Sequence, residues 1–217
     1  MKAHPLQDRL LAGARALGLL LDGGQIQRLL DYLDLLGKWN KVYNLTAVRD
    51  PADMLTQHLL DSLAVIAPLR RHTVGRAVRL LDVGSGGGLP GVVIAICCPE
   101  IAVVCVDAVA KKSAFIQQVA AALGLSNLSG LHARVESIAE PFDVVTSRAF
   151  ATLSDFTAWS AGALRPAGVW LAMKGKHPAD ELAALPSRVS VFHAEQLQVP
   201  DLNAERCLVW MKPAEEG

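Results

Sequence analysis

The sequence predicts an α/β protein in which a mostly parallel, doubly wound sheet follows an N-terminal helical cap. Three observations support this fold class. Apolar segments of strand length alternate with helical patterns from residue 79 onward, a glycine-rich turn joins the first of these strands to the next helix, and residues 1–70 contain only helical patterns. Such alternation is typical of parallel sheets, because each parallel crossover needs a connecting segment that is usually a helix.

Residues 1–70 are expected to form the helical cap. Asp50 and Pro51 predict a helix start, with aspartate as the capping residue and proline at the first helical position. Apolar residues recur at helical spacing in two stretches: Ile26, Leu29, Leu30, Leu33 and Leu36, and then Leu55, Leu59, Leu63 and Ile66. Four polar residues lie off the apolar face of the second stretch: Gln57, His58, Asp61 and Ser62.

The remaining chain is expected to form a Rossmann-like domain over residues 71–217, in one compact unit with the cap. The predicted strands are 79–84, 102–107, 129–133, 143–147, 168–174, 189–196 and 206–212. The predicted helices are 90–97, 111–123, 153–164 and 178–185. The last two strands are expected to pair antiparallel, which gives a seven-stranded sheet with one antiparallel strand.

Composition limits the classes of function. The chain has 217 residues, 52% of them hydrophobic, which suits one α/β domain with a small appendage. Lys plus Arg equals Asp plus Glu at 21 each, so any RNA contact must come from a local basic patch. The four cysteines lack C-x-x-C spacing, so core thiols are expected and no metal site. With no secretory signal and no apolar run of membrane-spanning length, a cytoplasmic protein is expected.

The glycine-rich turn from Gly84 to Gly88 indicates a ligand site. Glycine permits close approach of the main chain to a ligand, and Pro90 suits the first position of the next helix. Asp82 lies two residues before the turn, where a carboxylate suits the cationic amino group and sulfonium of S-adenosylmethionine. Asp107 ends the next predicted strand, 21 residues after Gly86, where an acid can accept hydrogen bonds from ribose hydroxyls.

Two other interpretations of the turn compete with S-adenosylmethionine. Gly86, Gly88 and Gly91 form a formal G-x-G-x-x-G, the pattern of a nicotinamide dinucleotide site. Asp82 disfavours this dinucleotide, because a dinucleotide-binding strand is usually apolar at that position. A tight turn without any ligand is the third interpretation. The turn, the proline and the two carboxylates together favour S-adenosylmethionine.

The methyl acceptor is less directly indicated. The segment after the fourth strand, Ser147 to Phe150, lacks the Asn/Asp-Pro-Pro-aromatic pattern of adenine methylation. No cysteine lies in a strand-end loop, as carbon-5 methylation of a pyrimidine would need. An acceptor that is already nucleophilic remains, and guanine N7 is one because its lone pair is free and it carries no proton. Glu136 can accept a hydrogen bond from the adenine amino group of the cofactor.

A local basic patch favours RNA as the acceptor. Lys38, Lys41 and Arg49 occur with Trp39 and Tyr43 in a stretch without acids, which is typical of RNA contact. The alternative is that the two aromatic residues pack the cap against the sheet. Two further pairs have a functional and a structural interpretation: Lys111 and Lys112 as phosphate contacts or an exposed helix start, and His58 and Asp61 as a shared site or a structural hydrogen bond.

Several segments together resemble the RsmG (GidB) family of bacterial 16S ribosomal RNA guanine-N7 methyltransferases. The resemblance covers roughly residues 10–212. It rests on Trp39-Asn40-Lys41, Asn44 to Asp50, His58-Leu59-Leu60-Asp61-Ser62, Asp82 to Gly91, Ser147 to Phe150 and Lys174-Gly175. It implies a class I S-adenosylmethionine-dependent methyltransferase that acts on the guanine at position 527, in the 530 loop of the small ribosomal subunit.

The resemblance implies that Gly84, Leu89, Asp107, Val135, Glu136 and Arg148 bind the cofactor, and the glycine turn adds Asp82 and Gly86 to this expected set. Residues expected to position the acceptor are Arg148, Lys174, His58, Asp61 and Arg49, with RNA contacts from Lys38, Lys41, Arg49, Lys111 and Lys112. No general base or nucleophile is expected. The alternatives are a methyltransferase for a protein or small molecule, a protein that binds the cofactor and RNA without turnover, and a nicotinamide oxidoreductase.

Overall fold

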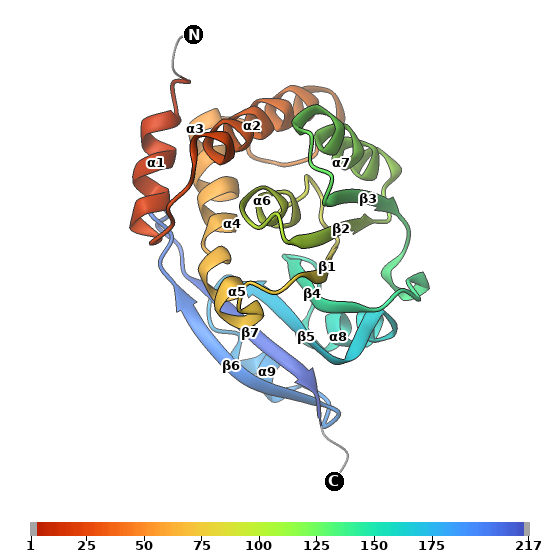
Figure 1. The fold of residues 1–217 in the computed structure, drawn as a ribbon. Coiled ribbons are helices and arrows are strands. Elements are labelled where there is room, and N and C mark those ends of the chain that lie inside the picture. The colour runs from red at the N-terminus through yellow and green to blue at the C-terminus, as the bar shows by residue number, and fades with distance from the viewer. Residues whose placement is uncertain (1–3, 215–217) are drawn as a thin grey trace.

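A computed structural model describes residues 4–214. Residues 1–3 of the predicted cap and residues 215–217 of the predicted Rossmann-like domain lie outside the described residues. The centre of the fold is a seven-stranded sheet in the order β3-β2-β1-β4-β5-β7-β6 (Figure 1). Its strands are β1 (Val78–Val83), β2 (Ile101–Asp107), β3 (Leu128–His132), β4 (Phe142–Arg148), β5 (Leu164–Lys174), β6 (Val189–Leu197) and β7 (Arg206–Pro213).

One strand of the sheet runs antiparallel, which confirms the predicted topology. β7 pairs antiparallel with both β5 and β6, whereas β1 to β5 pair parallel with one another. β5 begins four residues before the predicted strand, because Leu164 already pairs with Phe142 ahead of an irregularity in the register. The helix before it therefore ends at Ser160 instead of 164, and a short 3-10 turn (Ala161–Ala163) follows.

Helices cover both faces of the sheet. α6 (Gly91–Cys97) and α7 (Ala110–Leu123) pack with the cap on the face that carries Leu80, Val103 and Leu171. α8 (Leu153–Ser160) packs on the opposite face, over Leu81 and Val145. α9 (Ala179–Ala183) lies in the connection between β5 and β6. The first of these two cores is continuous from the cap into the sheet.

The cap consists of helices wrapped around α6 on one side of the sheet (Figure 1). Its helices are α1 (Gln7–Ala16), α2 (Gly23–Tyr43), α3 (Pro51–Met54), the π-helix η1 (Leu55–Leu60), α4 (Asp61–Leu63) and α5 (Ile66–Thr73). The predicted start at Asp50 is confirmed, since its carboxylate accepts hydrogen bonds from the amides of Ala52 and Asp53. The predicted apolar face, from Leu55 to Ile66, is completely buried.

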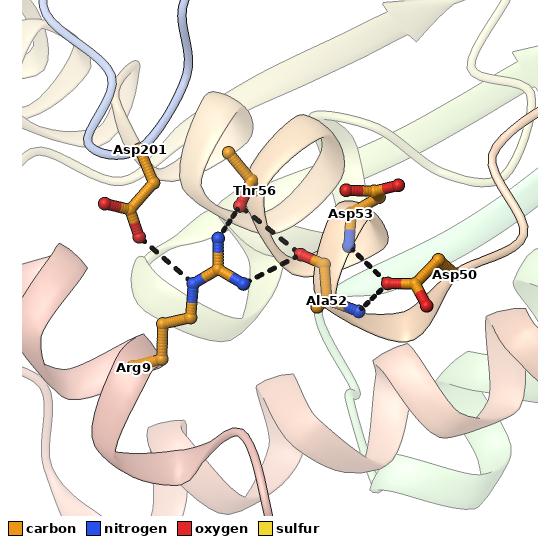
Figure 2. A network of polar contacts seen from close by, with 6 residues as sticks. All are labelled: Arg9, Asp50, Ala52, Asp53, Thr56 and Asp201. Atoms are coloured by element: carbon orange, nitrogen blue, oxygen red, sulfur yellow. Dashed lines mark hydrogen bonds and ion pairs between the residues drawn. The ribbon is translucent and has the colours of Figure 1, made fainter.

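Arg9 joins three segments that are distant in the chain (Figure 2). From α1, its Nε donates to Asp201 Oδ2 at 3.0 Å, and its Nη2 donates to the buried hydroxyl of Thr56 at 2.7 Å. Thr56 lies in the π-helix, and Asp201 lies in the loop before β7. The network therefore fixes that loop against the helix that carries His58 and Asp61.

All four cysteines are buried free thiols, as predicted. Burial raises the pKa of Cys97 to about 12 and that of Cys98 to about 11, so both stay protonated. Within residues 4–214, no group of three or more His, Cys, Asp or Glu side chains is arranged to hold a metal ion. In the same range, no helix combines the length and the apolar composition needed to cross a membrane.

Candidate active site

The glycine turn lies at the carboxyl end of β1, in the centre of the sheet. Gly84, Gly86 and Gly88 have φ of 64°, 58° and 90°, a region that other residues rarely adopt. A Cβ on Gly84 would overlap the Phe150 ring, and one on Gly88 would overlap Val92. A Cβ on Gly86 would meet nothing nearer than 4.0 Å. Gly86 is therefore the glycine that leaves space for a ligand.

Asp107 lies beside this turn, where the sequence predicts it. Its Oδ2 accepts the Gly86 amide at 3.1 Å and its Oδ1 accepts the Val109 amide at 2.9 Å. Lys112 Nζ lies 3.4 Å from the same carboxylate, so Lys112 stands next to Asp107 instead of forming a separate patch with Lys111. The turn and the end of β2 are thus held together by one carboxylate.

Asp82 is located differently from the prediction. It is completely buried beneath the turn and lines neither of the two cavities described below. Its Oδ2 accepts the amide of Gly91, the first residue of α6, at 2.8 Å. Burial raises the pKa of Asp82 to about 7. The geometry therefore makes Asp82 a support for the start of α6, which also begins one residue later than the predicted Pro90.

Two cavities adjoin at the carboxyl edge of the sheet and share Gly84 and Ala149. We call the one beside Asp107 the β2–β3 cavity. It has a volume of about 490 Å³ and includes Asp107, Lys112, Val135, Glu136, Phe150 and Trp159 in its lining. Trp159 meets Phe150 edge to face at 5.8 Å between ring centroids. The aromatic pair, the apolar Val135 and the two carboxylates suit a nucleoside.

We call the other cavity the cap cavity, because the cap supplies one of its walls. It has a volume of about 460 Å³ and includes Leu36, Thr46, His58, Asp61, Gly86, Leu89, Arg148, Lys174 and Arg206 in its lining. Four of the five residues predicted to position the acceptor meet here. Arg49 does not line either cavity and is exposed. The chain leaves the cavity wall after Thr46, before α3 begins at Pro51.

Asp61 organises the charges of the cap cavity. Its Oδ2 accepts Arg148 Nη1 at 2.8 Å, and its Oδ1 accepts Arg206 Nε at 2.6 Å. The Asp61 side chain is only 3% exposed, whereas the two arginines are 20% and 23% exposed. Arg148 also donates to the Gln57 carbonyl at 3.0 Å. One buried carboxylate thus orients two guanidinium groups that still reach the cavity.

Lys174 and His58 complete the polar wall of this cavity. Lys174 Nζ lies 2.8 Å from Glu181 and donates to the Ala151 carbonyl at 3.2 Å. His58 Nε2 lies 2.8 Å from Thr46 Oγ1. Burial, aided by the positive charge of Arg148, lowers the pKa of His58 to about 4. His58 is therefore neutral at physiological pH.

The predicted RNA patch lies outside both cavities. Lys38, Lys41, Arg49 and Lys111 are exposed. Trp39 packs on Phe115 of α7 at 5.4 Å between centroids, which supports the packing interpretation for this residue, and it also contacts Tyr43 at 5.0 Å. Tyr43 itself is 40% exposed. The exposed lysines can contact a partner, but they line neither the β2–β3 cavity nor the cap cavity.

Sequence reasoning missed Arg206, Thr46 and Glu181. Arg206 is the first residue of β7. It follows a polar loop, where an arginine in the sequence looks like an ordinary surface residue. The usable signal was that β7 runs antiparallel, so its first residue lies at the same edge as the last residues of the parallel strands.

Comparison with solved structures identifies the fold. The N-methyltransferase NodS from Bradyrhizobium japonicum WM9, in complex with S-adenosylhomocysteine, has a TM-score of 0.60 at 14% identity and covers 82% of this chain and 100% of its own. Magnesium protoporphyrin IX methyltransferase from Synechocystis, with bound S-adenosylmethionine, has a TM-score of 0.60 at 17% identity and covers 89% and 98%. At these identities the likeness shows the fold alone: that of a class I S-adenosylmethionine-dependent methyltransferase.

Sequence relatives then define the family. The family described as rRNA small subunit methyltransferase G, GidB, matches residues 25–209. Ribosomal RNA small subunit methyltransferase G of Acidovorax ebreus (strain TPSY) is 68% identical over 216 residues, 96% of each chain. Its namesake from Polaromonas sp. (strain JS666) is 67% identical over 210 residues, 95% and 93% of the two chains. This chain belongs to the rRNA small subunit methyltransferase G family and is an S-adenosylmethionine-dependent methyltransferase, as the resemblance implies.

Proposed function

We propose that this enzyme methylates N7 of a guanine in 16S ribosomal RNA, at position 527 in the 530 loop, with S-adenosylmethionine bound across the two adjoining cavities. The observation that carries the proposal is the junction at Gly84 and Ala149, where a cavity suited to a nucleoside meets a cavity lined by three cations. A methyl donor at that junction would face an acceptor held by Arg148, Lys174 and Arg206. Membership of the family supports the choice of RNA.

The residues of the β2–β3 cavity fit the adenosine part of the cofactor. Asp107 keeps its carboxylate at the cavity wall, where it can accept hydrogen bonds from ribose hydroxyls. Glu136 can accept from the adenine amino group, and the Phe150 and Trp159 rings offer aromatic surface to the base. The open space at Gly86 fits the rest of the cofactor, because a side chain there would occupy it. Asp82 acts from beneath, by holding Gly91.

The residues of the cap cavity fit a nucleotide acceptor. Arg148 and Arg206 are oriented by Asp61, so their guanidinium planes are fixed before an acceptor arrives. Guanidinium groups suit phosphate oxygens and the O6 edge of guanine. Lys174 adds a third cation at the end of β5. Lys38, Lys41, Arg49 and Lys111 lie outside this cavity, and we assign them to more distant phosphates of the RNA.

The proposed chemistry requires no proton removal by the protein. Bound S-adenosylmethionine supplies a methyl group from a cationic sulfonium, which leaves S-adenosylhomocysteine. Guanine N7 carries a lone pair and no proton, so this chain needs only to align the acceptor and exclude water. His58, which is neutral, contributes through its contact with Thr46 and the shape of the pocket. We place the reaction in the cytoplasm with the small ribosomal subunit, without a metal.

The test supplies labelled S-adenosylmethionine and small ribosomal subunits from cells lacking this methyltransferase. We expect one methyl group per subunit, mapped to N7 of guanine 527. Label in a different nucleotide, in ribosomal protein or only in small molecules would contradict the proposed acceptor. A second measurement tests the mechanism: single-turnover transfer should be nearly flat from roughly pH 6.5 to 8.5, because no general base titrates. A steep limb near neutral pH that His58→Asn removes would make His58 a catalytic base.

A further inference from the structure

Helix α2 of the cap contacts the unit formed by the glycine turn and α6 at two places: in the turn and at the last residue of α6. The hydroxyl of Tyr32 donates to the carbonyl of Gly87 at 2.6 Å, at the start of this unit. Gln25 Nε2 donates to the carbonyl of Cys97 at 3.2 Å, at its end. The two donors lie seven residues apart on one helix, which is about 10 Å, similar to the length of α6.

Tyr32 and its neighbour leave Gly87 little room to move. Tyr32 is completely buried, and burial raises the pKa of its hydroxyl well above 10.0, so the hydroxyl stays a donor. Leu36, one turn further along α2, is also completely buried and lines the cap cavity. Its Cδ1 lies 2.9 Å from the place of a Cβ on Gly87. The peptide at Gly87 is thus held from the cap side.

The turn needs such external support because of its composition. It contains four glycines between residues 84 and 88, and glycine loses more conformational freedom on ordering than any other residue. The hydrogen bonds within the turn include Gly88 N to Ser85 O at 2.7 Å. On the strand side, Asp107 holds Gly86. Tyr32 is the side chain that fixes the middle of the turn from the opposite side.

We propose that Tyr32 is a positioning residue for the cofactor: its hydrogen bond to Gly87 orders the glycine turn in the conformation that binds S-adenosylmethionine. The cap is then part of the cofactor site as well as a wall of the acceptor cavity. This inference rests on the proposed location of the cofactor across the turn. It assigns a function to a residue that contacts neither the β2–β3 cavity nor the cap cavity.

The test compares Tyr32→Phe with a matched control, Thr157→Val. Both remove one buried hydroxyl that donates to a main-chain carbonyl, and Thr157 bonds to Leu153 on the far face of the sheet. For Tyr32→Phe we expect calorimetry to give a Kd for S-adenosylhomocysteine about tenfold higher, equivalent to about 1.4 kcal/mol. The KM for S-adenosylmethionine should rise equally, with kcat and the KM for RNA nearly unchanged. An unchanged Kd, or an equal loss in Thr157→Val, would overturn the proposal.

A measurement on the wild-type protein keeps the proposal testable if Tyr32→Phe does not fold. Because coupling is reciprocal, S-adenosylhomocysteine should slow amide hydrogen exchange in residues 29–36 of α2 as well as in residues 84–90. Protection of 84–90 alone would overturn the role of Tyr32. Binding without protection of 84–90, or no binding at all, would instead contradict the proposed cofactor site.

Discussion

The two cavities at the edge of the sheet are built in different ways. The polar groups of the β2–β3 cavity come from one stretch of chain, between Asp107 and Glu136, and Asp107 is fixed mainly by main-chain amides. The cap cavity gathers its charged groups from α4, β4, β5 and β7, and fixes them by ion pairs. One site is therefore local, and the other depends on the assembly of the whole molecule. Changes to the ion pairs of the cap cavity should therefore spare cofactor binding.

The largest expected effect is on the glycine turn, where Gly86 lines the cap cavity two residues from the shared Gly84. Gly86→Val should raise the Kd for S-adenosylhomocysteine by more than about 100-fold, because the new side chain fills the open space at a φ of 58°. Gly124→Val is the matched control, since Gly124 ends α7 with a φ of 62° and no atom near its Cβ position. It carries the same backbone strain away from the cavities. Normal binding by folded Gly86→Val would contradict the turn as the cofactor site.

The next effect separates the two cavities. Asp61→Asn should lower kcat/KM for the ribosomal substrate by about 100-fold, because two guanidinium groups lose the carboxylate that orients them; breaking a buried ion pair commonly costs about 3 kcal/mol or more. The Kd for S-adenosylhomocysteine should change less than twofold. Glu195→Gln, which breaks the surface pair with Arg71, is the control and should retain activity. An equal loss of cofactor binding in Asp61→Asn would mean that the cavities are not independent.

A smaller effect distinguishes, by pH, the cap cavity from the buried support beneath the glycine turn. The folded-state pKa of His58 is lowered from 6.5 to about 4, so its stabilising contribution is present above pH 6.5 and is lost as pH falls toward 4. The folded-state pKa of Asp82 is raised from 3.8 to about 7, so its contribution is present below pH 3.8 and is lost as pH rises toward 7.

Urea unfolding of the wild type, His58→Asn and Asp82→Asn from pH 4 to 8 measures both contributions. The stability of the wild type relative to His58→Asn should decrease toward acid, and that relative to Asp82→Asn should decrease toward neutral pH. Parallel slopes for the two variants would contradict the opposite titration of these groups.

The smallest expected effect lies outside both cavities. Replacing Lys38 and Lys41 together by alanine should leave cofactor binding intact, weaken RNA binding several-fold and flatten its salt dependence, because fewer counterions are released. Binding measured between about 50 and 200 mM salt tests this. If the double variant bound RNA with the salt dependence of the wild type, these lysines would not contact RNA phosphates.

The same contrast explains what could be predicted from sequence. The alternation of strands and helices, the helix start at Asp50 and the place of Asp107 at the end of a strand follow from patterns within one stretch of chain, and the structure bears them out. The meeting of Asp61 with Arg206 joins residues 145 positions apart, and no local pattern encodes it.

Chemical type alone did not indicate where two of the predicted site residues lie. Asp82 has the charge that suits a cationic ligand, but the pleat of β1 directs its side chain under the turn, toward Gly91. Arg49 belongs to the same basic stretch as Lys41, yet the chain leaves the cavity before reaching it. In both cases the sequence indicated the charge of the side chain, and the fold decided where that side chain lies.

The π-helix has a consequence for insertions and deletions. A π-helical turn holds one residue more than the α-helical turn it replaces, while the helix on either side keeps its direction. Deleting the exposed Gln57 should therefore let the helix close into regular α form, with Asp50 still capping the amides of Ala52 and Asp53 and the apolar residues from Leu63 onward still buried. The shortened helix would lose the carbonyl that holds Arg148. A deletion normally disrupts a packed helix, but here its effect should be limited to the position of the Arg148 side chain.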